Sequence, residues 1–230
     1  MDFRSKFIAI DGPDGSGKGT QLERLAELIT SQGGRCRRAR DPGGTEIGDR
    51  IRHVVLGYDL ATMDPRCETM LFMASRAQLV TEIIRPALEA GETVLCDRFI
   101  SATCAYQGAV GVSVSDIIAL GRLAVGQTWP HLTIVLDVPP ELGFERTGRK
   151  SHHVGRRVPR KEDVAGQIAM FDGATPDAME RRSLDFHRRV RQLFHELPTV
   201  YPAPVVLVDA THDADAVWED VKAAVLNIAK

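Results

Sequence analysis

A glycine-rich segment near the N-terminus carries residue types that bind phosphate groups. It reads Gly12-Pro13-Asp14-Gly15-Ser16-Gly17-Lys18-Gly19-Thr20 and fits the G-x-x-x-x-G-K part of a phosphate-binding loop. The apolar run 7–10 before it predicts a buried strand, and residues 21–29 after it have apolar residues at helical spacing. Such a loop places backbone N–H groups and a helix N-terminus around one anion, and Lys18 adds a positive charge. We expect the donor nucleotide to contact Gly12, Asp14, Gly15, Ser16, Gly17, Lys18, Gly19 and Thr20.

Two oxygen-bearing side chains could hold a Mg²⁺ ion beside these phosphates. The hydroxyl after Lys18 comes one place later than in the usual motif, at Thr20, because Gly19 intervenes. Asp97 ends the apolar segment 93–96 and could hold Mg²⁺ through water, or instead position Arg98. The sequence therefore predicts a magnesium site that uses Thr20 and Asp97, with water between protein and metal.

Other residues have the chemistry to bind a second, acceptor phosphate and its base. Arg98 follows a strand and could clamp a phosphate, although a surface ion pair with Asp97 would give the same pattern. Phe72 and Arg76 share one helix face and could enclose and hydrogen-bond a base; the alternative is a core phenylalanine beside a solvated arginine.

Two further segments carry weaker signals for the same acceptor site. Arg40 lies in the turn 40–46, where it could reach the acceptor phosphate or simply belong to a turn fixed by proline and glycine. Gln107 could read polar edges of a base, and Tyr106 could limit the sugar pocket.

Composition indicates an ordinary globular protein. Hydrophobic residues make up 43% and charged residues 26% of the 230 residues, and the net charge is −2. This balance argues against a general nucleic-acid surface, and no apolar run approaches the ~20 residues of a membrane span. We expect a cytoplasmic protein with no nucleic-acid or membrane partner. Its four cysteines should be reduced and mostly buried.

Alternating strand and helix patterns predict a parallel sheet covered on both faces. The expected strands are 6–10, 35–40, 93–97, 132–138 and 204–208, and the expected helices are 18–31, 46–56, 65–90, 113–126, 139–147, 178–196 and 214–228. Asp64 and Pro65 mark the start of the third helix, and Pro86 should kink its last turns. Ligands gather at the carboxyl ends of such strands, so Asp11, Asp41 and Asp97 should face one crevice.

Residues 148–177 break this pattern, with glycines, prolines and dense charge. A loop of this length is usually a functional lid or disordered, and a closing lid would exclude water from phosphoryl transfer. Arginines between Arg146 and Arg191 either reflect a general bias toward arginine on solvated helices or aim at phosphates. We expect one domain over residues 1–230, with residues 148–177 as its mobile lid.

Taken together, these motifs resemble the thymidylate kinase family over most of the chain, from Phe7 to about Phe194. The resemblance rests on FIAIDGPDGSGKGTQ, RDPGGTEIGDRIRHVVL, LFMASRAQLVTEIIRPALEAGETVLCDRF, AYQG, HLTIVLDVPPELGFER and SLDFHRRVRQLF, in that order. It implies a P-loop NTPase fold, a three-layer α/β/α arrangement with a five-stranded parallel sheet. It also implies transfer of a phosphoryl group from ATP to dTMP with Mg²⁺, and a homodimer.

The resemblance also implies roles for individual residues. Arg98 would bind the dTMP phosphate with help from Arg40, and Asp14 would lie near the acceptor's sugar and phosphate. Phe72 would stack on thymine and Arg76 would hydrogen-bond it, with Tyr106 against the deoxyribose and Gln107 near the base. Thr103 flanks Ala102, where the family has a serine, and is included in the acceptor site. The loop lacks an arginine, so the catalytic arginine would come from the lid, from Arg149, Arg156 or Arg157.

Two alternative functions remain open on the sequence. One is the same chemistry on another acceptor, such as dUMP or a purine monophosphate. The other is a nucleotide-binding regulator without transfer activity, suggested by the long lid and by Ala178, where the family's D-R-x-E element has arginine.

Overall fold

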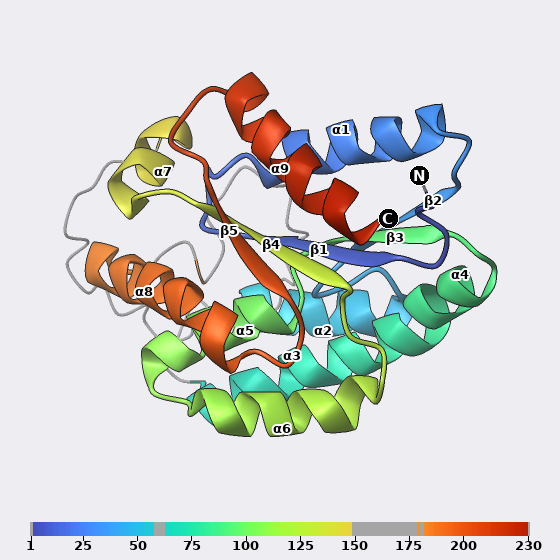
Figure 1. The fold of residues 1–230 in the computed structure, drawn as a ribbon. Helices are drawn as coiled ribbons and strands as arrows, with labels where there is room; N and C mark the ends of the chain where they lie inside the picture. The colour runs from blue at the N-terminus through green and yellow to red at the C-terminus, as the bar shows by residue number, and fades with distance from the viewer. Residues whose placement is uncertain (1, 58–62, 149–178, 180–181, 230) are drawn as a thin grey trace.

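The computed structural model describes residues 2–57, 63–148, 179 and 182–229, and within them one parallel sheet forms the centre of the molecule (Figure 1). Its strands are β1 (Phe7–Asp11), β2 (Cys36–Arg40), β3 (Thr93–Asp97), β4 (Leu132–Asp137) and β5 (Val205–Asp209), in the order β2-β3-β1-β4-β5. All five predicted strands and their parallel direction are confirmed.

The position of each strand in the sheet explains its sequence. β1 lies in the middle, where Ile8 pairs with Leu95 of β3 and Leu132 of β4, and all five of its residues are buried. A strand that is covered on both faces reads as a continuous apolar run. β2 lies at the edge, and its sequence CRRAR keeps three arginines at the surface, which also discourages pairing with another sheet edge.

Successive residues of β1 point into two separate apolar clusters, as the period of two requires. Ile8 and Ile10 face a cluster with α1 (Lys18–Ser31) and α9 (Ala214–Ile228), while Phe7 and Ala9 face a cluster on the opposite side. Figure 1 shows α1 and α9 together on one face of the sheet and the remaining layer of helices on the other. The predicted α/β/α arrangement is therefore confirmed.

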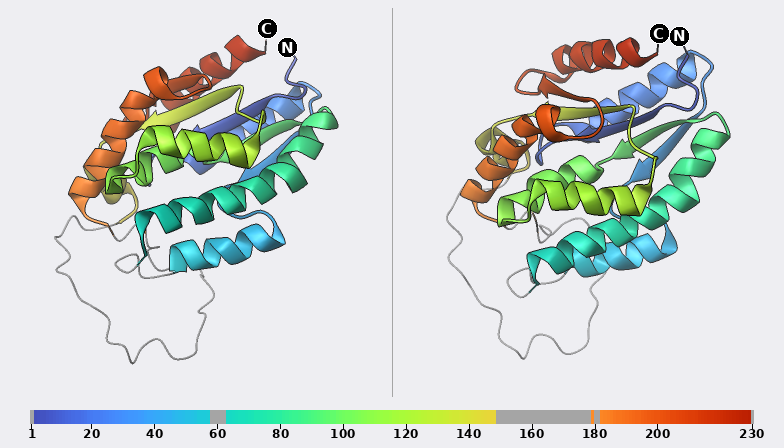
Figure 2. Two further views of the ribbon diagram at one scale, coloured as in Figure 1. Left: turned by 90° about the horizontal axis from the view of Figure 1, so that it is seen from below. Right: turned by 60° about the horizontal axis from the view of Figure 1, so that its bottom comes forward.

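The second helical layer contains the elements that shape the functional site. It includes α2 (Glu46–Gly57), α3 (Pro65–Leu79), a π turn (Val80–Ile84), α4 (Arg85–Glu89), α5 (Ile100–Tyr106), a 3₁₀ turn (Gly108–Val110), α6 (Val114–Val125) and α8 (Leu184–Val200). The short helix α7 (Pro140–Arg146) follows β4. In Figure 2, α2, α3 and α6 lie side by side beneath the sheet.

Two expectations about helices need correction, and one helix was missed. The helix expected over 65–90 is interrupted by the π turn Val80–Ile84, which ends two residues before Pro86, whose ring nitrogen has no hydrogen to donate. The helix α5 was not expected at all. The last helix of this layer begins at Leu184 rather than near residue 178, because Ser183 caps its N-terminus, and it ends at Val200 rather than 196.

Within the described ranges, none of the helices has the length and apolar character needed to cross a bilayer. The four cysteines are unpaired thiols, but only Cys96 and Cys104 are buried; Cys36 is half-buried and Cys67 is exposed. The expectation that they are mostly buried is thus met by two of the four.

Candidate active site

The loop between β1 and α1 is shaped by three glycines in left-handed or related conformations. Gly12, Gly15 and Gly17 have φ values of 140°, 77° and 88°. A Cβ atom on Gly12 would lie 2.5 Å from the Leu136 carbonyl oxygen, and one on Gly15 would lie 2.4 Å from the Gly143 oxygen. The loop therefore packs backbone against backbone on β4 and α7, and a side chain at Gly12 or Gly15 would prevent this close approach.

Lys18 begins α1 and folds its side chain over this loop. Its Nζ donates hydrogen bonds to the carbonyl oxygens of Gly12 and Pro13, both at 3.0 Å. Burial, and then the nearby charge of Arg98, lowers the pKa of Lys18 from 10.5 to about 8. The amine thus occupies the concave side of the loop, where its charge is poorly solvated and an anion would stabilise it.

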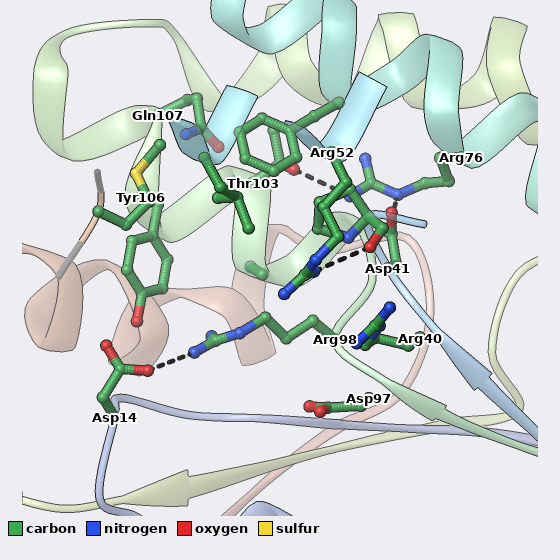
Figure 3. A pocket seen from close by; sticks show the side chains of 15 residues that line it. Asp14, Arg40, Asp41, Arg52, Arg76, Asp97, Arg98, Thr103, Tyr106 and Gln107 are labelled. Atoms are coloured by element: carbon green, nitrogen blue, oxygen red, sulfur yellow. Dashed lines mark hydrogen bonds and ion pairs between the residues drawn. The ribbon is translucent and has the colours of Figure 1, made fainter. Parts of the chain in front are cut away.

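A pocket of about 630 Å³, counting space open to solvent, lies next to this loop (Figure 3). All eight residues that the sequence assigns to the acceptor site line it: Asp14, Arg40, Phe72, Arg76, Arg98, Thr103, Tyr106 and Gln107. They come from segments as far apart as residues 14 and 107, and the fold brings them to one place. Whether they bind dTMP stays a prediction.

Arg98 connects the pocket to the phosphate loop. Its Nη1 donates to the Gly12 oxygen at 3.0 Å and its Nη2 donates to Asp14 Oδ1 at 2.8 Å, as Figure 3 shows for Asp14. The guanidinium carbon lies 5.1 Å from the centre of the Tyr106 ring. Arg98 has φ of 66°, an uncommon value for a residue with a side chain. The guanidinium therefore faces the glycine loop, and the surface ion pair with Asp97 is not what the structure contains.

Asp11 does not face the pocket as expected. It is completely buried at the end of β1, where its carboxylate accepts a hydrogen bond from Ser101 Oγ and lies 4.0 Å from Arg98 Nη1. Burial raises the pKa of Asp11 to about 6, and the charge of Arg98 opposes that rise. Asp41 and Asp97 do line the pocket, so two of the three expected aspartates are confirmed there.

A buried ion pair holds Arg76 in the pocket wall. Its Nε donates to Asp41 Oδ2 at 2.5 Å, and its Nη2 donates to the Phe99 oxygen and to Thr103 Oγ1. Nη1 contacts the sulfur of Met73, which is a weak acceptor. Burial raises the pKa of Asp41, and the Arg76 charge opposes this. Nη1 is therefore the nitrogen of Arg76 best able to donate to a ligand.

Sequence reasoning missed several groups around this pocket. Arg52 and Met179 line it, and Arg52 donates to the Pro42 oxygen at 2.9 Å. Glu68 and Arg182 lie behind Gln107: Glu68 accepts from Gln107 Nε2 at 2.6 Å and from Arg182 Nη2 at 3.1 Å. A glutamate in the first turn of a helix is common because its charge interacts favourably with the helix dipole. The sequence therefore provides no reason to assign Glu68 to the site.

The candidate metal ligands differ in their surroundings. Thr20 is exposed on the first turn of α1, and Asp97 has one buried carboxylate oxygen without a hydrogen-bond partner in the described part of the chain. Ser16 Oγ, in the glycine loop, is also buried without a hydrogen-bond partner among the described residues. The lid arginines Arg149, Arg156 and Arg157, and Ala178, lie outside the described residues.

A parallel sheet with a glycine loop and lysine at its centre, next to a pocket lined with arginines, defines a P-loop NTPase of the α/β class. The family model for thymidylate kinase matches residues 10–221, so the chain belongs to the thymidylate kinase family.

Individual relatives agree with this assignment. The thymidylate kinase of Deinococcus radiodurans is 40% identical over 220 residues, which cover 95% of each chain. That of Syntrophotalea carbinolica is 39% identical over 214 residues, covering 93% of this chain and 91% of the relative. A third, from an Exiguobacterium strain, is 40% identical over 216 residues, covering 94% and 91%.

Proposed function

We propose that this chain transfers the γ-phosphoryl group of ATP to dTMP, giving ADP and dTDP for deoxynucleotide synthesis. The main support for the proposal is the position of Arg98, which lines the acceptor pocket and donates hydrogen bonds to Gly12 and Asp14 of the phosphate loop. A guanidinium at this junction would hold an acceptor phosphate beside the donor phosphates. This is the arrangement that an in-line transfer requires.

In this proposal positioning and charge supply most of the catalysis. Loop amides and Lys18 hold the donor phosphates, while Arg98, with Arg40 helping, fixes the acceptor phosphate. No general base is needed, because the attacking oxygen belongs to an already ionised phosphate. Phe72 and Arg76 hold the base, and Tyr106 faces the sugar. Residues 148–177 act as the lid of one kinase domain, and Arg149, Arg156 or Arg157 offsets charge on the transferred group.

The residues near the loop suit a Mg²⁺ ion bound largely through water. Thr20 and Asp97 offer hard oxygen donors, and the unpartnered Asp97 oxygen would accept a hydrogen bond from a metal-bound water. Magnesium in such sites usually keeps several waters and relies on substrate phosphates, so few protein ligands are needed. When bound, the ion would neutralise charge on the donor phosphates.

The test is steady-state turnover with ATP, Mg²⁺ and a panel of monophosphates: dTMP, dUMP, AMP and CMP. We expect the highest kcat/KM with dTMP; faster phosphorylation of AMP or CMP would contradict the assignment.

Arg98→Ala should lower the rate by ~10³ or more, and Lys18→Ala should abolish turnover. The controls Arg37→Ala and Lys222→Ala remove cations outside the pocket and should leave the rate unchanged. Nucleotide binding without turnover in the folded wild type would indicate a regulator.

We also propose a homodimer and a cytoplasmic location. Exposed apolar side chains lie on the neighbouring helices α2, α3 and α6, namely Ile47, Val54, Met70 and Leu123. A second copy of the chain packed on these helices would cover them. Four unpaired thiols suit a reducing compartment.

A further inference from the structure

The amide of Gln107 is held in one orientation by a charged partner behind the pocket. Gln107 Nε2 donates to Glu68 Oε1 at 2.6 Å, and both side chains are 1% exposed. An ionised carboxylate can only accept hydrogen bonds, so it must face the NH₂ group and not the oxygen of the amide. The opposite orientation would place two acceptors against each other in a buried site.

Arg182 maintains the charge that fixes this orientation. Its Nη2 lies 3.1 Å from Glu68 Oε2 and 3.5 Å from Oε1, and its guanidinium carbon lies 4.6 Å from the centre of the Phe186 ring. Without a cation a buried carboxylate would favour its neutral form, which could donate to the Gln107 oxygen and reverse the amide. Arg182 therefore stabilises the acceptor-only state of Glu68.

The consequence is that Gln107 presents an acceptor to the pocket. With Nε2 committed to Glu68, its Oε1 remains, and Figure 3 shows this oxygen on the side of Thr103 and Arg76 with the nitrogen turned away. Arg76, which lines the same pocket, offers a donor through Nη1. The pocket thus combines one fixed acceptor with one guanidinium, which can only donate.

We propose that Glu68 is a positioning residue for base selection. It holds the Gln107 amide with its oxygen toward the pocket, so that the pocket binds a pyrimidine with N3–H and O4 and rejects cytosine. This inference rests on the proposed function, because it assumes a pyrimidine base in this pocket. Thymine and uracil have a donor at N3 and an acceptor at O4. Cytosine, bound in the same pose, has an acceptor at N3 and an amino donor at position 4, so both contacts are mismatched.

The decisive experiment compares dTMP, dUMP and dCMP in wild type and in Glu68→Gln. The neutral glutamine can donate or accept, so the Gln107 amide is no longer fixed. We expect the dTMP:dCMP ratio of kcat/KM to fall about tenfold or more, the cost of one mispaired buried group. The dTMP:dUMP ratio should stay unchanged, because both bases carry N3–H. Glu68→Asp, which keeps the carboxylate, should retain most of the preference, and Glu219→Gln on α9 is the control for loss of a surface charge.

A double-mutant cycle separates orientation from simple structural support. In a Gln107→Leu background there is no amide to orient, so Glu68→Gln should no longer change the dTMP:dCMP ratio. An effect of equal size in both backgrounds, or an unchanged ratio in the folded single variant, would overturn the proposal. If Glu68→Gln does not fold, Arg182→Gln decides: a smaller ratio supports the role of the charge and an unchanged one overturns it.

Calorimetric binding of dTMP and dCMP without ATP distinguishes this inference from the proposed function. A wild type that binds dTMP in preference to dCMP, and loses the preference in Glu68→Gln, supports the inference even if no dTDP forms. In that case only the transfer activity would be disproved. Equal binding of dTMP and dCMP by the wild type would overturn the inference itself.

Discussion

Lys18 links ligand binding to pH. Because burial and Arg98 lower its pKa to about 8, the amine of the ligand-free protein loses its proton well below 10.5, the value for a solvated lysine. Donor phosphates would restore a high pKa, so binding at pH 8 should take up about half a proton. The measurement is ATP calorimetry in two buffers with different ionisation enthalpies, in which Lys18→Met should remove the uptake. An observed enthalpy independent of the buffer would contradict this assignment.

The same residue affects stability in a defined direction. Between pH 8 and 10.5 the unfolded chain binds more protons at Lys18 than the folded chain does, so the contribution of Lys18 to the free energy of unfolding should rise across this window. Burial raises the pKa of the Cys96 and Cys104 thiols, which lowers stability over the same range in any variant that keeps them. Urea titrations of the ligand-free wild type and of Lys18→Met at several pH values isolate the lysine: the stability of the wild type relative to Lys18→Met should rise with pH.

Arg98 combines an unfavourable backbone with a functional side chain. Its φ of 66° disfavours any residue with a Cβ, so Arg98→Gly and Arg98→Ala should differ although both lose the contact with Asp14. We expect the glycine variant to be more stable by about 0.5–1 kcal/mol. Glycine removes the left-handed strain, but it also gives the unfolded chain more conformational entropy, which offsets part of the gain. Both should lose transfer activity similarly. Equal unfolding free energies for the two variants would show that this backbone stores no strain.

At the scale of elements, α3 positions the base side of the pocket through its cap. Asp64 accepts hydrogen bonds from the amides of Arg66 and Cys67, just before the turn that carries Glu68. Asp64→Ala should lower the free energy of unfolding by about 1 kcal/mol and raise KM for dTMP. Asp213→Ala is the matched control, because it removes an equivalent cap from α9 on the other face of the sheet. It should cost similar stability with no change in KM.

The elements differ in how far their sequences reveal them. Helices 18–31 and 214–228 were predicted to the residue, because apolar spacing and flanking glycine or capping Asp213 agree. Helix α5 was not predicted: all seven residues of ISATCAY are buried, so no polar face marks a helical period. The π turn was missed because Pro86 suggests a break, but not the form that it takes.

At the scale of the whole molecule, the strand ends place the expected acceptor residues correctly, but not the partners behind them. Arg98 and Arg40 follow from strand positions, because parallel strands end at one edge of the sheet. Glu68 on α3 contacts two side chains that are 39 and 114 residues further along the chain, Gln107 at the end of α5 and Arg182 just before α8. No local pattern encodes such a contact, so only the folded arrangement reveals which polar side chains meet.

Exposed apolar side chains on α3 and α6 favour assembly of two chains into a dimer. Leu123 on α6 is 84% exposed and Met70 on α3 is 54% exposed, although α3 and α6 pack together. If a second copy covers them, light scattering should give twice the 25.3 kDa chain mass, and Leu123→Glu should give the monomer. Folding should survive, because the substituted side chain is at the surface. Val200→Glu, at an exposed valine on α8, should leave the dimer intact. Each monomer should still phosphorylate dTMP, because one chain supplies every residue that lines the described pocket. A monomeric wild type would refute the dimer.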